Sequence, residues 1–374
     1  MTAPPMRCAS KNAAFWIIPP SARSLQSAAA KWSPAVQSVH SGEKMIMFDR
    51  RLLLKGGLAA TALAAMPFPA RAQATKVKAP FPIFDTHPHF YTNDIARYPT
   101  KPSITPAAKE KVLNNPMTHD VVTKYWDEAG ILMGCGVQYN TVYDTDNTYL
   151  LDVCKSDPGR VLPVVILKAT DPATPDTLRK MTRENKIAGV RLFGSPINGE
   201  FEFFTDAALP AWDAIDELGI VAVLMLVGGD LNRTMGRVHD FAMRYPNVRI
   251  ELDHLGYTNP KTSPSTFGLT PNHMAVRPHR NLYWKLTSFH IVNMIESNKI
   301  PLKDFFDYVK DLYGTDRMMW GSDMGNTPGT MEQHYAMLQR AIDATSHWSY
   351  ADRKAFFFDT PFRCFVPGGT RGLY

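Results

Sequence analysis

Short apolar runs alternate with amphipathic stretches from about residue 76 to the end of the chain. The apolar runs have the length of buried strands, and the amphipathic stretches repeat their apolar residues at helical spacing. The run over 220–227 is continuously apolar, which is typical of a parallel strand that is buried on both faces. The pattern predicts eight strands, at residues 82–87, 131–138, 161–167, 189–193, 220–227, 248–253, 282–287 and 317–320.

A helix is expected after most of these strands. In one of them Thr118 is a candidate N-cap residue, the helix runs through Ala129, and Gly130 ends it. The Pro-rich stretch before about residue 117 and the stretch over 258–271 are expected to be loops. The remaining helices are expected at 147–155, 175–185, 206–218, 232–245, 302–313, 330–344 and 351–358.

Eight strand–helix units follow one another within about 300 residues, and no change of composition separates them. This arrangement predicts a single (β/α)8 barrel over residues 73–374, with a doubly wound open sheet as the competing fold. The chain has no G-x-G-x-x-G or Walker-type loop after any of the expected strands, which argues against nucleotide binding.

The net charge of +6 belongs to the first part of the chain of 374 residues. Residues 1–72 hold nine Lys and Arg but only two Asp and Glu, so the rest carries 32 basic and 33 acidic side chains. A chain without a basic surplus gives no support to a nucleic-acid partner. We expect a small-molecule substrate instead, and the sequence leaves the oligomeric state open.

Residues 1–72 are expected to be an upstream extension followed by a signal peptide. The sequence Asp-Arg-Arg-Leu-Leu-Leu-Lys at 49–55 resembles a twin-arginine export signal. The mildly apolar run over 56–66 is too short to span a bilayer, and Ala-Arg-Ala at 70–72 offers a cleavage site. We therefore expect an exported, periplasmic protein with no membrane segment in its mature form. A membrane anchor is the alternative, and Met45 or Met47 is a possible true start of translation.

Cysteine use agrees with a protein that does not depend on disulfides. Cys8 lies in the leader, and Cys135, Cys154 and Cys364 are too few and too scattered for a disulfide framework. We expect these three to be buried thiols.

Polar side chains gather at the ends of the predicted strands, where barrels of this kind have their active sites. His87 and His89 end the first strand two residues apart, so both imidazoles leave it on one side, suited to holding a metal or moving protons. Each residue alone also has a structural explanation, but convergence on one rim favours a functional site. Besides His87 and His89, the candidate residues at the strand ends are Gln138 after the second strand, Arg191 in the fourth, His254 after the sixth, Ser288 and His290 after the seventh, and Asp323 after the eighth.

Four of these segments carry a resemblance to a known family. They are Phe-Asp-Thr-His-Pro-His at 84–89, Gly-Val-Arg-Leu-Phe at 189–193, Leu-Asp-His-Leu-Gly at 252–256 and Trp-Gly-Ser-Asp at 320–323. Together they resemble the amidohydrolase superfamily, and within it the amidohydrolase-related branch of 2-pyrone-4,6-dicarboxylate lactonases, sulfomuconolactone hydrolases and sugar lactonases. The resemblance covers about residues 81–365 and implies an amidohydrolase-type barrel.

The resemblance also implies roles for the candidate residues. Asp323 would be the general base that activates water, and His87, His89 and His254 would polarise or orient the scissile carbonyl. Arg191 would bind a substrate carboxylate or stabilise the oxyanion. The remaining substrate-binding candidates are Gln138, Ser288 and His290.

One departure from the family pattern concerns metal binding. Metal-dependent relatives place a further His at the end of the fifth strand, but residues 221–229 contain no such ligand near Met225 or Leu226. The lysine that binuclear relatives use after the fourth strand is also missing, and Arg191 lies near its place. We therefore expect no obligatory cofactor. The alternative is one divalent metal, zinc or manganese, held by His87, His89 and Asp323.

These observations predict an enzyme, a hydrolase that opens a small anionic lactone or related cyclic carbonyl compound by Asp-activated water. The first alternative is a metal-dependent decarboxylase of an aromatic or muconate-type acid. The second is a non-catalytic binding protein on the same barrel.

Overall fold

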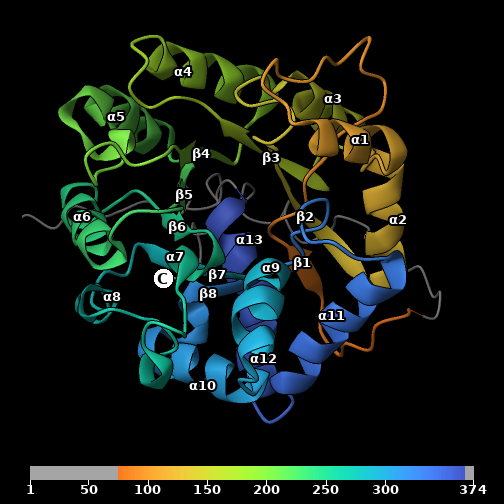
Figure 1. Ribbon diagram of the computed structural model, residues 1–374, viewed down its shortest axis with the longest axis vertical. Helices are drawn as coiled ribbons and strands as arrows, with labels where there is room; N and C mark the ends of the chain where they lie inside the picture. Colours follow the sequence, from red (N-terminus) through yellow and green to blue (C-terminus); the bar gives the residue numbers. More distant parts are fainter. Residues whose placement is uncertain (1–74, 367–374) are drawn as a thin grey trace, which may run out of the picture. The chain divides into compact units, whose positions relative to one another are not determined.

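The computed structural model describes residues 75–366. Eight parallel strands form one sheet whose order, β1 to β8, is also their order in the chain. The first and last strands meet as well, because the amide and the hydroxyl of Thr86 donate to the Trp320 carbonyl oxygen at 3.4 and 2.7 Å. The sheet therefore closes into a barrel surrounded by helices (Figure 1), and the predicted single (β/α)8 barrel is confirmed.

Each predicted apolar run overlaps one strand, and β8 extends one residue past its predicted run, to Gly321. The strands are β1 Ile83–Asp85, β2 Ile131–Val137, β3 Val161–Ile166, β4 Gly189–Phe193, β5 Val221–Met225, β6 Ile250–Leu252, β7 Leu282–Thr287 and β8 Met318–Gly321. Gly189 begins β4 where the backbone of β5 approaches closely, and a Cβ there would lie 2.8 Å from the Val221 carbonyl oxygen. Some predicted runs extend beyond their strands, and residues such as His87 and Asp253 lie just past a strand end.

The long helices agree with the sequence pattern. They are α2 His119–Ala129, α3 Thr148–Ser156, α4 Thr174–Asn185, α5 Leu209–Leu218, α6 Leu231–Arg244, α10 Leu302–Tyr313 and α11 Met331–Ala344. Gly130 ends α2 in the left-handed region with a φ of 77°, as predicted. Thr118 occupies the N-cap position of α2, but its side chain makes no capping hydrogen bond.

The structure corrects the sequence prediction at two places. The helix α1, Pro106–Asn114, lies in the stretch expected to be a loop, and the Thr105 hydroxyl caps it by accepting from the Ala108 amide at 3.2 Å. The predicted helix at 351–358 is part of a longer segment. That segment consists of α12 Tyr350–Lys354, a π-helical turn Ala355–Asp359 and α13 Thr360–Phe365.

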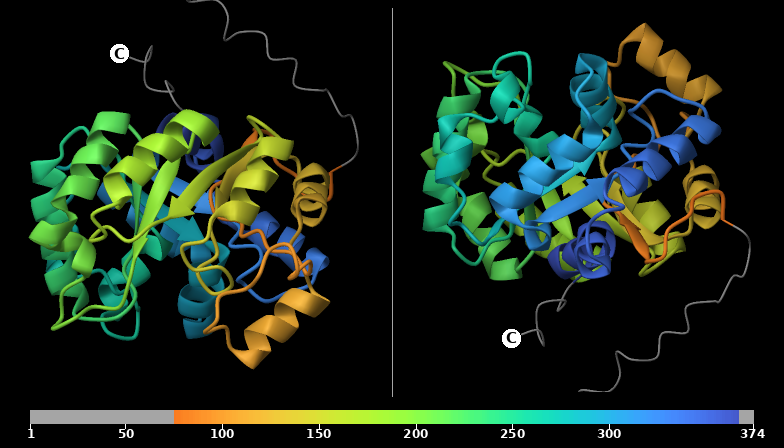
Figure 2. Two further views of the ribbon diagram at one scale, coloured as in Figure 1. Left: turned by 90° about the horizontal axis from the view of Figure 1, so that it is seen from above. Right: turned by 90° about the horizontal axis from the view of Figure 1, so that it is seen from below.

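Apolar side chains from the strands and from α13 pack inside the barrel, and Cys364 and Phe365 of α13 lie among them. The Arg363 guanidinium donates to the Asp316 carbonyl oxygen at 2.8 Å, just before β8 begins. Helix α13 therefore lies at the end where the strands begin, and α1 lies at the opposite end (Figure 2). Active sites of such barrels lie at the end that α13 leaves free.

Cys135, Cys154 and Cys364 are buried and free, as predicted. The predicted twin-arginine signal, its cleavage site and Cys8 lie outside the described residues. Within residues 75–366, no helix is long and apolar enough to cross a membrane.

Candidate active site

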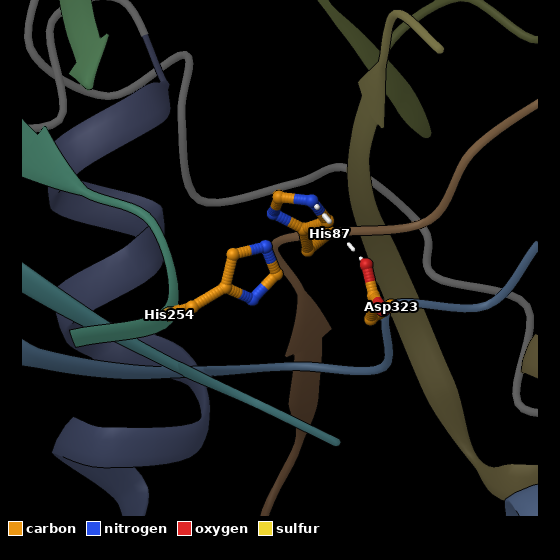
Figure 3. Close-up of side chains that lie close together, drawn as sticks. All are labelled: His87, His254 and Asp323. Carbon is orange, nitrogen blue, oxygen red and sulfur yellow. Dashed lines mark ion pairs between the residues drawn. The ribbon is translucent and has the colours of Figure 1, made fainter. Parts of the chain in front are cut away.

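Three of the predicted residues form a compact buried cluster at the C-terminal ends of the strands. His87 follows β1, His254 follows β6, and Asp323 follows β8, and their side chains point toward one another (Figure 3). One ligating atom from each lies within 4.8 Å of the other two. His87 Nε2 lies 3.5 Å from Asp323 Oδ1. The barrel thus brings together residues that are far apart in the sequence.

His87 is oriented by a carboxylate on its other side. Its Nδ1 lies 3.1 Å from Asp253 Oδ1, and both side chains are fully buried. Burial lowers the pKa of His87 well below its usual value, so the ring is neutral at neutral pH. Neither ring nitrogen makes a hydrogen bond among residues 75–366, but Asp253 is the nearer of the two carboxylates, so we assign the single ring proton to Nδ1, and Nε2 then presents a lone pair to the cluster.

Asp323 is an ionised carboxylate. Burial opposes its charge, but the nearby imidazoles of His89, His254 and His87 outweigh burial and hold its pKa well below the usual range. Its Oδ2 accepts hydrogen bonds from Asn326 at 2.9 Å and from Thr327 at 2.7 Å. Its Oδ1 has no hydrogen-bond partner among residues 75–366, and neither has the Nε2 of His87 that faces it. Two buried acceptors that face each other favour a positive group between them, such as a proton or a metal ion.

The backbone at this cluster is unusual. Asp323 has a φ of 51° and His254 a φ of 54°, in the left-handed region that residues other than glycine rarely adopt. Such conformations cost free energy, and they occur at functional sites as well as in turns, as at Lys186 and Lys299 in this chain. The backbone conformation of Asp323 and His254 is consistent with a functional role for the cluster.

His254 and His89 have different surroundings. His254 Nδ1 is hydrogen-bonded to the Thr287 hydroxyl, and burial lowers the pKa of His254 to about 4. His89 Nδ1 pairs with the Val137 carbonyl oxygen at 2.9 Å, which leaves its Nε2 3.6 Å from Asp323 Oδ1. The compact cluster therefore contains His254 where the sequence-based metal set had His89.

The predicted substrate-binding residues divide into two groups. Arg191 and Gln138 are already bound to protein groups, because Arg191 Nε donates to Asp253 Oδ2 at 2.7 Å and Gln138 donates to the Asp146 carbonyl oxygen. Ser288 and His290 are the first and last residues of the short helix α9, Ser288–His290, and both are buried. His290 Nε2 lies 3.0 Å from the hydroxyl and from the carbonyl oxygen of Thr258, so it ties α9 to the segment after His254. Their contacts with substrate stay predictions.

A charged group inside the barrel was not predicted from the sequence. Lys285 of β7 lies 2.9 Å from Glu251 Oε2 and 2.9 Å from Asp253 Oδ1, and all three residues are fully buried. Burial opposes the charge of Lys285, but the two carboxylates outweigh it and raise its pKa. Burial raises the pKa of Glu251. Asp253 therefore connects Lys285 and Arg191 to His87. The sequence signal for this buried group was a single Glu in the strand β6 and a single Lys in the neighbouring strand β7.

The donor set fits one divalent metal. Two imidazoles and a carboxylate are typical zinc ligands, and a mononuclear catalytic site commonly has three protein ligands and a water. The contact from Asp253 to His87 Nδ1 resembles the contacts by which carboxylates orient metal-binding histidines. The end of β5 offers no further imidazole, since Met225 ends that strand. This geometry supports the alternative of one divalent ion and gives no support to the expectation that no cofactor is needed.

Comparisons with known proteins agree with the fold. The family model described as Amidohydrolase matches residues 84–365. An L-fucono-1,5-lactonase of Burkholderia ambifaria is 27% identical over 222 residues, which cover 56% of this chain and 73% of that protein. A putative 2-pyrone-4,6-dicarboxylic acid hydrolase from Pseudomonas putida has a similar structure, with a TM-score of 0.60 and 20% identity over 76% of this chain and 97% of that one.

Two further similar structures contain metals. One is an amidohydrolase from Burkholderia multivorans with bound zinc, at a TM-score of 0.57 and 20% identity over 76% of this chain and 98% of that one. The other is a dihydroxybenzoic acid decarboxylase from a Polaromonas species with bound manganese and an inhibitor, at a TM-score of 0.54 and 16% identity over 79% and 99%. At these identities the likeness shows the fold.

The family match spans the whole barrel from β1 to α13. A non-catalytic binding protein was an alternative, but the comparisons favour the predicted enzyme. The chain therefore belongs to the amidohydrolase family and is an enzyme of the hydrolase class, as its sequence motifs predicted.

Proposed function

We propose that this protein hydrolyses a small anionic lactone or a related cyclic carbonyl compound, with Asp323 accepting the proton of the attacking water. The observation that carries the proposal is the buried cluster of His87, His254 and Asp323, in which His87 Nε2 and Asp323 Oδ1 face each other without hydrogen-bond partners among residues 75–366. The similarity to an L-fucono-1,5-lactonase supports ring opening of a lactone, and the buried cations near the cluster are the support for an anionic substrate.

The charge states of the residues define what each can do. Asp323 is ionised and can accept a proton, but its low pKa makes it a weak base on its own. A divalent ion held by His87, His254 and Asp323 would supply a water acidic enough to lose its proton to such a base. His254 is a neutral imidazole near pH 7, so it can donate to or accept from the reacting oxygen atoms.

The buried cations would favour the anion that forms in the reaction. Arg191 keeps its Nε on Asp253, and its guanidinium carries a positive charge beside the cluster. A fixed positive charge in a site from which water is excluded stabilises a developing oxyanion without reorganisation. We propose this role for Arg191, and substrate contacts for Gln138 and Ser288.

A decarboxylase is the second candidate function. The likeness to a dihydroxybenzoic acid decarboxylase with bound manganese favours it, because the cluster could hold such an ion. The lack of an imidazole at the end of β5 counts against it, because the ion would have fewer protein ligands. Release of carbon dioxide from a dihydroxybenzoate, compared with ring opening of a lactone, separates the two candidates.

We also propose that the protein is exported in its folded state. The support is the pair Arg50 and Arg51 before an apolar run, followed by an Ala-Arg-Ala cleavage site. The low use of cysteine agrees with a protein that does not need oxidative folding.

The test uses the purified mature protein, L-fucono-1,5-lactone and a lactone that carries a carboxylate, with acid release followed by a pH indicator. We expect ring opening, near-stoichiometric zinc or manganese, and loss of activity on chelation. Asp323→Asn should lower kcat by about 10²–10⁴-fold, the usual contribution of a general base, and keep the circular dichroism spectrum. Asp240→Asn, which changes an exposed carboxylate of α6, is the control and should keep normal activity. Near-normal turnover in Asp323→Asn would remove Asp323 as the base.

A further inference from the structure

Lys111 of α1 is a cation at the same end of the barrel as the cluster, on a helix that was not predicted from the sequence. Helix α1 lies at the end opposite α13 (Figure 2), and Lys111 is in its last turn. The Lys111 ammonium donates a hydrogen bond to the Gly325 carbonyl oxygen at 2.5 Å. Gly325 follows Asp323 by two residues, so the ammonium reaches the loop that carries the proposed base.

In the described part of the chain, the ammonium of Lys111 is not paired with a carboxylate. Within residues 75–366, no carboxylate oxygen lies within 4.0 Å of it, whereas Lys285 and Arg191 each pair with carboxylates. Lys111 is half-buried, and this burial lowers its pKa while the charge of Asp323 opposes the change. Holding a partly desolvated cation without a paired anion costs free energy, and an anionic ligand would offset that cost.

Aromatic contacts connect Lys111 to the cluster. Its ammonium lies 5.9 Å from the ring centroid of Tyr91 and 5.8 Å from that of Tyr139. Tyr139 stacks on the imidazole of His89 with ring centroids 4.5 Å apart. The Tyr139 hydroxyl also donates to Asn326 at 3.1 Å, and Asn326 in turn donates to Asp323. Lys111 is therefore one side-chain layer away from His89 and Asp323.

Arg191, the residue expected to recognise a substrate carboxylate, is partly neutralised. Its Nε is bound to Asp253, and the residue is 2% exposed. The ammonium of Lys111, unlike the guanidinium of Arg191, is not paired with a carboxylate in the described part of the chain. We propose that Lys111 binds the carboxylate of an anionic lactone whose reacting carbonyl lies at the His87–His254–Asp323 cluster, and so determines the preference for anionic substrates. This inference rests on the proposed lactone hydrolysis.

The test compares two substrates that differ only in charge, a γ-butyrolactone bearing a carboxylate and the corresponding carboxamide. In Lys111→Met, we expect KM for the carboxylate to rise at least about tenfold, the size of one lost charge-assisted hydrogen bond, with kcat nearly unchanged. KM for the carboxamide should stay within about twofold, and Lys111→Arg should restore most of the preference. Lys109→Met changes an exposed lysine of the same helix and should alter neither substrate.

Two kinetic outcomes would overturn the inference. Equal losses for both substrates would show that Lys111 only ties α1 to the loop after β8, and unchanged kinetics for both would show no role. If the wild-type enzyme opens neither lactone, the proposed function fails separately. Isothermal titration with the carboxylated lactone then still tests Lys111, because weaker binding by Lys111→Met supports the inference. Equal binding by both proteins, or binding by neither, overturns it.

Discussion

Asp253→Asn is expected to destabilise the protein strongly, because Asp253 is the anion shared by three buried donors. Its two oxygens face Arg191 Nε at 2.7 Å, Lys285 Nζ at 2.9 Å and His87 Nδ1 at 3.1 Å. Asparagine has nearly the same shape, so the substitution creates no cavity. It replaces one acceptor oxygen by an NH2 group, which then faces a donor whichever way the amide turns.

The magnitude follows from the burial of these partners. Removing one member of a buried ion pair costs about 3–5 kcal/mol, because the remaining charge stays buried and unpaired. Glu251 lies 2.9 Å from Lys285 and has a raised pKa, so it can ionise when Asp253 loses its charge and recover part of this cost. We therefore expect a loss at the lower end, about 3 kcal/mol in the free energy of unfolding.

Urea unfolding followed by tryptophan fluorescence measures this loss, since Trp284 and Trp320 are buried in β7 and β8. The matched control is Asp240→Asn, which breaks a 2.7 Å pair with Arg237 in which the Asp240 side chain is 54% exposed. Exposed pairs contribute about 1 kcal/mol or less. A loss for Asp253→Asn within about 1 kcal/mol of the control would refute the reasoning that the carboxylate neutralises a buried network.

Two further predictions concern pH and export. Burial lowers the pKa of His273 to about 3, against 6.5 for the unfolded chain, so below pH 6.5 the unfolded state binds a proton that the folded state excludes. His273 should therefore lower the free energy of unfolding by about 1.4 kcal/mol for each pH unit between 6.5 and 4, and His273→Gln should show a flatter profile in urea unfolding at several pH values. Replacing Arg50 and Arg51 by lysine should retain the protein in the cytoplasm of an expressing bacterium, as cell fractionation would show; undiminished export would contradict the twin-arginine proposal.

The barrel could be predicted because its strands are buried on both faces. Continuous apolar runs such as β5, Val221–Met225, cannot belong to helices with one solvated face, and their regular spacing leaves few alternative folds. Helix α1 was missed because its region is rich in proline, which was interpreted as a loop. Pro106 is the first residue of α1, where its missing N–H costs nothing, and Thr105 caps the helix, so the signal was present.

The candidate site could be predicted only in part. The position of His87, His254 and Asp323 follows from strand ends, which a parallel barrel brings to one rim. Their protonation and partners do not follow from spacing, because those depend on which side chains fill the barrel interior. Glu251 and Lys285 lie in the adjacent strands β6 and β7. Only the structure shows that the Lys285 ammonium pairs with both Glu251 and Asp253 inside the barrel.

Asp253 joins the stability of the barrel to the chemistry at its rim. The cations that make Asp253 necessary for stability also keep it ionised, and the ionised carboxylate keeps the ring proton of His87 on Nδ1. Asp253→Asn should therefore lower both stability and turnover, whereas Asp323→Asn leaves no buried cation unpaired and should lower turnover far more than stability. If Asp253→Asn lost stability but kept full activity in the fraction that folds, the orientation of His87 would not depend on Asp253. The Nε2 of His87 would then have no fixed role in the cluster.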